Sequence, residues 1–243
     1  MAADRTATTW LILPTYEEAA NIEAIVAAAL ANLPEDRRVL VVDDASPDGT
    51  GEIAERIAAA DDDVEVLHRP GKSGLGPAYV AGFRRALAGG AELVCQMDAD
   101  FSHDPSDLPR LLAAAADADL VLGSRYVDGG GVGEWGPTRR LISLGGSAYA
   151  RLVLGVGVRD LTGGFKVFRS AVLEAIAFET IPSLGYAFQV ETTYRALRAG
   201  FRVVELPILF HDRRVGESKM SGRIVVEAAL RVPAMRLGRG RSG

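Results

Sequence analysis

Short runs rich in apolar and β-branched residues alternate with alanine-rich segments through the first half of the chain. The runs are typical of buried strands and lie at 10–13, 39–42, 64–67, 93–97 and 120–122. Between them, apolar residues recur at helical spacing, which predicts helices over 19–31, 50–60, 77–88 and 105–116. Strands separated by helices of this length predict βαβ units. We therefore expect an α/β fold with a mostly parallel sheet and helices on both of its faces.

The pattern changes after Gly123, where glycine-rich loops interrupt it. We predict loops over 128–137 and 160–165, helices over 139–154, 170–177 and 186–199, and a strand over 203–210. No internal repeat and no low-complexity linker divides the chain. The simplest organisation is a single domain over residues 1–221, followed by a short tail over residues 222–243.

Charge is distributed unevenly between this body and the tail. The chain of 243 residues has a net charge of −5, while residues 222–243 hold five arginines and one acid, a net of +4, so the body sums to −9. An acidic body argues against nucleic-acid binding. In the tail, apolar residues from Ile224 to Met235 are interleaved with arginines, which predicts a basic amphipathic helix on an anionic membrane surface. Packing of this helix on the body, or a separate small membrane-protein partner, are the alternatives.

The cysteine count and the lengths of the apolar runs indicate the cellular compartment and whether the chain can span a membrane. The lone Cys95 excludes an internal disulfide and favours a reducing compartment. No apolar run approaches the roughly 20 residues that span a bilayer. We therefore expect a cytoplasmic protein, bound peripherally at the cytoplasmic face of a membrane if the tail acts as proposed.

Acidic residues gather where the predicted strands end, the edge at which open α/β sheets bind ligands. Asp98 and Asp100 follow the fourth strand and are spaced to hold a hard divalent cation through oxygen ligands, although an ordinary turn has the same composition. Asp43 and Asp44 follow the second strand and could accept hydrogen bonds from a nucleotide. Helix capping there is better assigned to Asp48 and Thr50.

Glycine-rich and basic segments complete the candidate site. The loop from Gly71 to Gly76 carries Lys72 but lacks the Walker A spacing, and the first strand lacks the dinucleotide-binding glycines. The glycines of the loop 71–76 would let its backbone approach a nucleotide. Alternatively, this loop only caps the helix that follows it. Arginine and lysine suit phosphate oxygens, and the candidates are Arg125, Arg139, Arg140, Arg213, Arg214 and Lys219. Arg125 stands at a strand end and is assigned a function, whereas Arg140 and Arg214 are assigned to solvated surface.

Seven short motifs in order resemble glycosyltransferase family 2, with its GT-A fold, and within it the dolichyl- or polyprenyl-phosphate mannosyltransferases. The resemblance runs from about Trp10 to Lys219. Its motifs are 14–18 with Asn21, 41–50, 74–76, 97–100 with 103–105, 123–126, 160–165 and 216–219.

The resemblance implies roles for individual residues. Nucleotide binding falls to Pro14, Tyr16, Glu18, Asp43 and Asp44, with Asp98 nearby. Lys72, the candidate from the glycine-rich loop, is assigned to the same nucleotide-sugar site. Asp98 and Asp100 would hold Mg²⁺ or Mn²⁺, and Ser102 replaces a glutamine that joins the coordination in some relatives. Phosphate groups would be held by Arg125, Arg139, Ser143 and Arg213, with Lys219 beside them. The loop 160–165 is expected near the donor sugar, with Gly163 in place of the usual serine.

The activity implied is transfer of mannose from GDP-mannose to a polyprenyl (dolichyl) monophosphate, with inversion and release of GDP. A phosphate monoester is already anionic at neutral pH, so this reaction needs no strong general base. Positioning and charge compensation would fall to Asp100, Arg125, Arg139 and Arg213. The alternatives are transfer of glucose from UDP-glucose to the same lipid, and a catalytically silent nucleotide-binding regulator.

Overall fold

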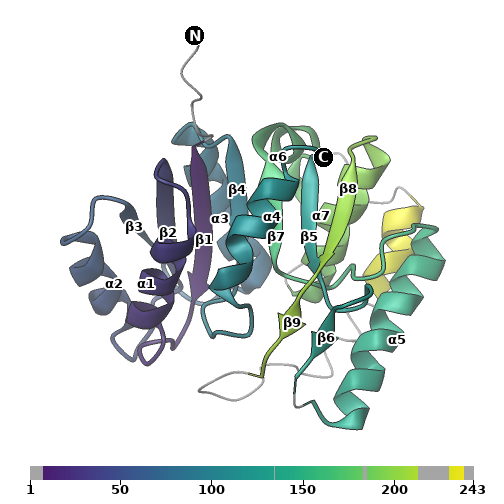
Figure 1. Cartoon of the computed structure of the whole chain (residues 1–243), viewed down its shortest axis with the longest axis horizontal. Coiled ribbons are helices and arrows are strands. Elements are labelled where there is room, and N and C mark those ends of the chain that lie inside the picture. The colour runs from purple at the N-terminus through teal and green to yellow at the C-terminus, as the bar shows by residue number, and fades with distance from the viewer. Residues whose placement is uncertain (1–7, 134, 183–184, 213–229, 238–243) are drawn as a thin grey trace.

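The computed structural model describes residues 8–133, 135–182, 185–212 and 230–237 (Figure 1). A seven-stranded sheet with the strand order β3-β2-β1-β4-β7-β5-β8 forms its centre. The strands of this sheet are β1 (Thr9–Thr15), β2 (Arg37–Asp43), β3 (Val64–His68), β4 (Leu93–Gln96), β5 (Leu120–Ser124), β7 (Lys166–Arg169) and β8 (Val203–Pro207). A small second sheet pairs β6 (Gly131–Val132) with β9 (Leu209–Phe210) in parallel.

Helices cover both faces of the sheet, as the sequence predicts (Figure 1). They are α1 (Ile22–Asn32), α2 (Thr50–Ala58), α3 (Leu75–Ala88), α4 (Leu108–Ala114), α5 (Pro137–Leu154), α6 (Ser170–Ala175) and α7 (Tyr186–Arg198), with 3₁₀ turns η1 (Pro105–Asp107) and η2 (Phe178–Thr180). Alternate residues of β1 enter opposite cores because side chains alternate along a strand. Trp10 and Ile12 belong to the core that includes residues of α3 and α7, whereas Leu11 and Leu13 belong to the core that includes residues of α1 and α4.

Strand β7 is the main departure from the predicted architecture. It lies between β4 and β5 and is antiparallel to both, while the other pairs of the sheet are parallel. The sequence analysis placed no strand here, because a run of four residues with a cation at each end does not resemble a buried strand. Lys166 is nevertheless completely buried in the structure. The mostly parallel α/β sheet is confirmed, with this one exception in its middle.

Several element boundaries also differ from the predicted ones. β1 continues through Pro14 to Thr15, and its last residues pair with Val42 and Asp43 of β2. The single strand predicted over 203–210 is two strands, β8 and β9, which belong to different sheets. The loop predicted over 128–137 contains β6, and α5 begins at Pro137, where proline suits the first helical turn.

Part of the C-terminal tail packs on the body. Residues 230–236 are helical, Val232 is buried in the core that contains Trp10, and Met235 packs against that core. Arg236 Nη1 donates a hydrogen bond to the carbonyl of Val153 near the end of α5. The remaining tail positions, 222–229 and 238–243, lie outside the described residues. Among the helices that the structure describes, none is both long enough and apolar enough to cross a bilayer.

Candidate active site

Backbone strain marks the carboxyl edge of the sheet. Glu17, Ala45 and Phe101 follow β1, β2 and β4, and they have φ angles of 58°, 54° and 60°. Non-glycine residues rarely adopt this left-handed conformation, and such residues concentrate at functional sites. Three of them at the ends of neighbouring strands place the candidate site where the acids of the sequence analysis gather.

Asp98 and Asp100 lie at the centre of this edge, directly after β4. The side chain of Asp98 is 30% exposed, whereas Asp100 is buried and its Oδ1 accepts a hydrogen bond from the backbone N–H of Ser102 at 3.0 Å. Tyr79 of α3 lies beneath Asp98, with its hydroxyl 3.5 Å from Asp98 Oδ1. One carboxylate thus faces solvent and the other is held by the turn that follows it.

The donor set of this turn fits a magnesium or manganese ion that keeps part of its coordination for ligands from elsewhere. Ser102 Oγ is buried, with no hydrogen-bond partner among the described residues, and it belongs to the same turn as Asp100. Within the described ranges there is no cluster of three or more histidine, cysteine or acidic side chains suited to a metal. Such an ion is commonly bound by one or two protein carboxylates, while the diphosphate of a substrate supplies further oxygen ligands.

His103 supports Asp98 and is not placed as a base. Its Nδ1 accepts a hydrogen bond from the backbone N–H of Asp98 at 3.2 Å, and its ring packs between Phe165 and Phe210. Burial lowers the pKa of His103, although Asp98 and Asp100 act against this shift. The imidazole is therefore a neutral support for the turn.

Asp43 and Asp44 are buried and already have protein partners. Asp43 accepts hydrogen bonds from the hydroxyl and the backbone N–H of Ser46, which close the turn after β2. Asp44 accepts a hydrogen bond from Arg69 at 2.5 Å. Burial raises the pKa of Asp44, although Arg69 acts against that shift. The sequence analysis did not single out Arg69, since an arginine before a proline and a glycine resembles an ordinary loop.

The predicted nucleotide-binding loops lie together. Ser73 of the glycine-rich loop donates its backbone N–H to Asp44, and its hydroxyl accepts a hydrogen bond from Arg69. Lys72 Nζ lies 3.9 Å from the centre of the Tyr16 ring, a cation–π contact. This contact joins the loop after β1 to the loop after β3.

Glu18 and Asp48 contribute to the order of the same edge. Glu18 accepts a hydrogen bond from Asn21, and its backbone N–H donates to the hydroxyl of Thr50. The N-cap position of α2 is Gly49, not Asp48 or Thr50 as predicted, although Asp48 does accept a hydrogen bond from the backbone N–H of Thr50, the first residue of the helix. Burial acts to raise the pKa of Asp48, but the hydrogen bonds from Thr50 and Ala19 lower it overall.

Arg125 lies in a buried ion pair after β5. Its Nε and Nη2 donate to the two carboxylate oxygens of Asp160, each at 2.7 Å, and Nη2 also donates to Thr162. Burial disfavours the guanidinium charge, but the carboxylate of Asp160 raises the pKa of Arg125 overall. Its hydrogen bonds to described side chains use Nε and Nη2. Arg125 therefore joins the predicted donor-sugar loop to the predicted phosphate site.

Aromatic rings join Arg125 to Arg139. Both guanidinium groups lie near the Trp135 ring, with their central carbons 5.8 Å (Arg125) and 4.3 Å (Arg139) from its centre. Phe210 packs edge-on against Trp135. Arg139 also pairs with Asp212 at 2.8 Å, and Ser143 Oγ accepts a hydrogen bond from the hydroxyl of Tyr126. The predicted phosphate-binding residues Arg213 and Lys219 lie outside the described residues.

A buried polar cluster lies under the acids and was missed by the sequence analysis. Gln96 of β4 donates a hydrogen bond to Gln189 Oε1 of α7 at 2.8 Å, and Lys166 Nζ donates to the carbonyl of Gln189 at 2.7 Å. A Cβ atom on Gly164 would lie 3.7 Å from both Asp98 Oδ1 and Gln189 Nε2. The loop 160–165 thus passes directly beside Asp98, with Gly164 close to both Asp98 and Gln189.

Two known proteins align with this chain over most of its length. An undecaprenyl-phosphate mannosyltransferase of Micrococcus luteus is 50% identical over 221 residues, which are 91% of this chain and 90% of the relative. A polyprenol monophosphomannose synthase of Mycolicibacterium smegmatis is 49% identical over 227 residues, covering 92% and 85% of the two chains.

Solved structures show the same fold at low sequence identity. Glucosyl-3-phosphoglycerate synthase of Mycobacterium tuberculosis, in complex with Mn²⁺ and UDP-glucose, has a TM-score of 0.67 at 19% identity and covers 98% of this chain and 81% of its own. A mannosyltransferase of Pyrobaculum calidifontis with GDP-mannose and Mn²⁺ has a TM-score of 0.59 at 17% identity, covering 97% and 74%. Residues 10–177 match the sequence profile of the glycosyl transferase family 2. With this match and these relatives, the chain belongs to glycosyltransferase family 2.

Proposed function

We propose that this protein transfers mannose from GDP-mannose to a polyprenyl monophosphate, with inversion at the anomeric carbon and release of GDP. The observation that carries the proposal is the 50% identity, over nine-tenths of both chains, with a relative named as an undecaprenyl-phosphate mannosyltransferase. The site agrees with it chemically, because an acidic edge suited to a metal and a nucleotide lies beside a pair of aromatic-stacked arginines.

The acidic edge would bind the donor. Asp98 and Asp100 would hold Mg²⁺ or Mn²⁺, which when bound stabilises the negative charge of the departing diphosphate. Asp43, Asp44 and the loop with Tyr16 and Lys72 would hold the nucleoside, together with Pro14 and Glu18. The loop 160–165, which passes beside Asp98 at Gly164, would lie near the donor sugar.

The cationic group would bind the acceptor. Arg125 and Arg139, with Ser143 and with Arg213 and Lys219 beyond the described residues, would hold the acceptor phosphate. A phosphate oxygen forms the bond to the anomeric carbon while the bond from that carbon to the diphosphate breaks, and GDP leaves with the electron pair. The nucleophile is already ionised, so no side chain has to remove a proton. The neutral His103, engaged with the Asp98 backbone, fits this mechanism.

A radiolabelled transfer assay tests the proposal. Purified protein is incubated with polyprenyl phosphate and either GDP-mannose or UDP-glucose, with Mg²⁺, with Mn²⁺ or with a chelator. We expect labelled lipid from GDP-mannose only, and only with a divalent ion. Labelled lipid from UDP-glucose would replace the proposal with the glucosyltransferase alternative. Nucleotide binding with no transfer under any condition would favour the silent regulator.

The acceptor is a lipid, so the proposal includes work at a membrane surface, on its cytoplasmic face. The arginine-rich tail over 222–243 or a small membrane-protein partner would hold the protein there. The described part of that tail uses Val232 and Met235 to pack on the body, so its contribution to membrane binding would come from its other residues.

A further inference from the structure

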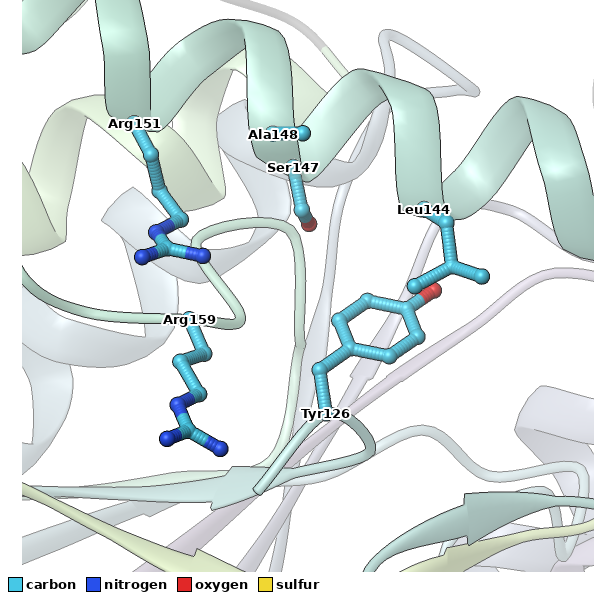
Figure 2. Close-up of a pocket in the computed structure, with 6 residues that line it drawn as sticks. All are labelled: Tyr126, Leu144, Ser147, Ala148, Arg151 and Arg159. Atoms are coloured by element: carbon cyan, nitrogen blue, oxygen red, sulfur yellow. The ribbon is translucent and has the colours of Figure 1, made fainter.

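A pocket of about 400 Å³ lies under α5, apart from the acids of the candidate site. It is lined by Tyr126, Leu144, Ser147, Ala148, Arg151 and Arg159. Figure 2 shows that both guanidinium groups lie on the side opposite the Tyr126 ring, while Ser147, Ala148 and Leu144 descend from the helix above. The pocket therefore combines two cations, a hydroxyl and an apolar wall.

The two arginines have little compensating charge. Arg151 Nε is buried, without a hydrogen-bond partner among the described residues. Arg159 is half exposed, and its Nη1 lies 3.3 Å from a carboxylate oxygen of Asp128, which is fully exposed. The nearby Glu205 accepts hydrogen bonds from the backbone N–H groups of Arg159 and Asp160. None of the six lining residues is acidic, and the carboxylate paired with Arg159, that of Asp128, is fully exposed to solvent.

The outer surface of α5 is apolar where it borders this pocket. Leu141 and Leu152 are 71% and 81% exposed, and Leu144, which lines the pocket, is 40% exposed. No charged residue occurs from Leu141 to Ala150. The helix as a whole carries Arg139, Arg140 and Arg151 and no acid. An exposed apolar face beside cations only is complementary to an anionic lipid surface and unsuited to water alone.

We propose that this pocket binds the phosphate group of an anionic membrane lipid, while the exposed leucines of α5 enter the outer part of the bilayer. The pocket adjoins the proposed acceptor site, because its lining residues Tyr126 and Ser147 are hydrogen-bonded to Ser143 and Thr162. Its cations, Arg151 and Arg159, are not among the residues proposed to bind the acceptor phosphate, so the lipid is assigned as a second one. The role is recruitment and orientation of the protein on the membrane, and it does not depend on which sugar is transferred.

Vesicle co-sedimentation tests the pocket. The double variant Arg151→Gln/Arg159→Gln is compared with wild type on vesicles of phosphatidylcholine alone and of phosphatidylcholine with phosphatidylglycerol. We expect the variant to bind the anionic vesicles at least about tenfold more weakly and the neutral vesicles as wild type does. The charge-matched control is Arg56→Gln/Arg198→Gln, which removes two exposed arginines from α2 and α7 and should bind like wild type. Equal loss in both double variants would reduce the effect to net charge and overturn the proposal.

Three further measurements test the role of the exposed leucines, the choice between lipid and free phosphate, and the independence of the pocket from sugar transfer. Leu141→Gln/Leu152→Gln, which changes only exposed side chains, should weaken binding to both kinds of vesicle. Inorganic phosphate added to the anionic vesicles should not release wild-type protein beyond the effect of chloride at equal ionic strength. Release specific to phosphate would assign the pocket to the free ion and overturn the lipid assignment. Transfer to a short-chain acceptor without vesicles should be unchanged in Arg151→Gln/Arg159→Gln, which separates failure of the pocket from failure of the proposed function.

Discussion

The acidic and the cationic halves of the candidate site are built in different ways. The acids follow β1, β2 and β4 at the centre of the sheet, and Asp43, Asp44 and Asp100 are all buried and hydrogen-bonded. The cations lie beyond β5 and at the start of α5, where Arg139 is partly exposed and rests on Trp135. Arg125 is the exception among the cations, because it is buried against Asp160.

This difference matches the two kinds of ligand in the proposed function. A buried carboxylate is costly unless fixed partners compensate it, so the acidic half is pre-organised before a nucleotide enters. In the cationic half, aromatic faces contact both arginines, and each arginine also has one carboxylate partner, Asp160 for Arg125 and Asp212 for Arg139. Arg125 joins the two halves through the loop 160–165. Four substitutions test this division, ordered from the largest expected effect.

Arg125→Met should have the largest effect, because it leaves Asp160 buried without a counter-ion. We expect about 3–5 kcal/mol loss in the free energy of unfolding, measured by urea denaturation. Arg125→Met/Asp160→Asn removes both charges and should regain most of this stability while transfer stays lost. Recovery of transfer in the double variant would show that Arg125 only balances Asp160 and does not bind phosphate.

Asp100→Asn should abolish most activity and leave the fold intact. The amide oxygen can still accept the hydrogen bond from Ser102, but the negative charge for the metal is gone. We expect kcat/KM to fall about 10²- to 10³-fold with little change in Tm. Titration of Mn²⁺ during the assay should show weaker metal activation. A variant with wild-type kcat/KM in the presence of a chelator would contradict the metal role.

Arg139→Gln should affect the acceptor alone. Its ion pair with Asp212 is partly exposed on both sides, so the free energy of unfolding should change by less than about 1 kcal/mol. Loss of a charge-assisted contact should raise the KM for polyprenyl phosphate about tenfold or more, with the KM for GDP-mannose unchanged. Arg140→Gln, at the neighbouring exposed position, is the matched control and should behave as wild type.

Lys166→Met should have the smallest effect on transfer, and it should change the pH dependence of stability instead. Burial lowers the pKa of Lys166 to about 7, against 10.5 for an ordinary lysine. Between these values the unfolded chain binds more protons than the folded one, so stability rises with pH by up to about 1.4 kcal/mol per unit. Urea denaturation at pH 7 to 10 should show this slope in wild type, and a smaller slope in the variant. An identical slope in both proteins would show that Lys166 is charged throughout.

The sequence predicted the central architecture because strand, helix and turn signals agreed there. The runs at 39–42 and 93–97 contain the buried parts of β2 and β4, and the acids that follow them lie at one edge because parallel strands end together. Lys72 and Tyr16 were both assigned to the nucleotide, and the structure brings them into contact. The loop 160–165, expected near the donor sugar, passes beside Asp98.

The features that were missed depend on contacts between distant parts of the chain. Lys166 is polar, and its place in a buried strand follows from acceptors on α7, which no local pattern reveals. Arg69 reaches Asp44 across 25 positions, and Trp135 gains its role only when β6 and β9 bring Phe210 against it. Non-local compensation of buried charge is therefore what the sequence leaves undetermined.

The contact between the C-terminal helix and α5 bears on how the protein can be engineered. Val232 fills part of the main core, and Arg236 is bonded to the Val153 carbonyl, so these tail residues belong to the folded domain. Truncation at residue 221 would remove core side chains together with the arginines, and any loss of membrane binding would be confounded with a loss of stability. Substitution of the exposed Leu230 and Leu237 keeps the core intact and is the cleaner way to ask what the tail does.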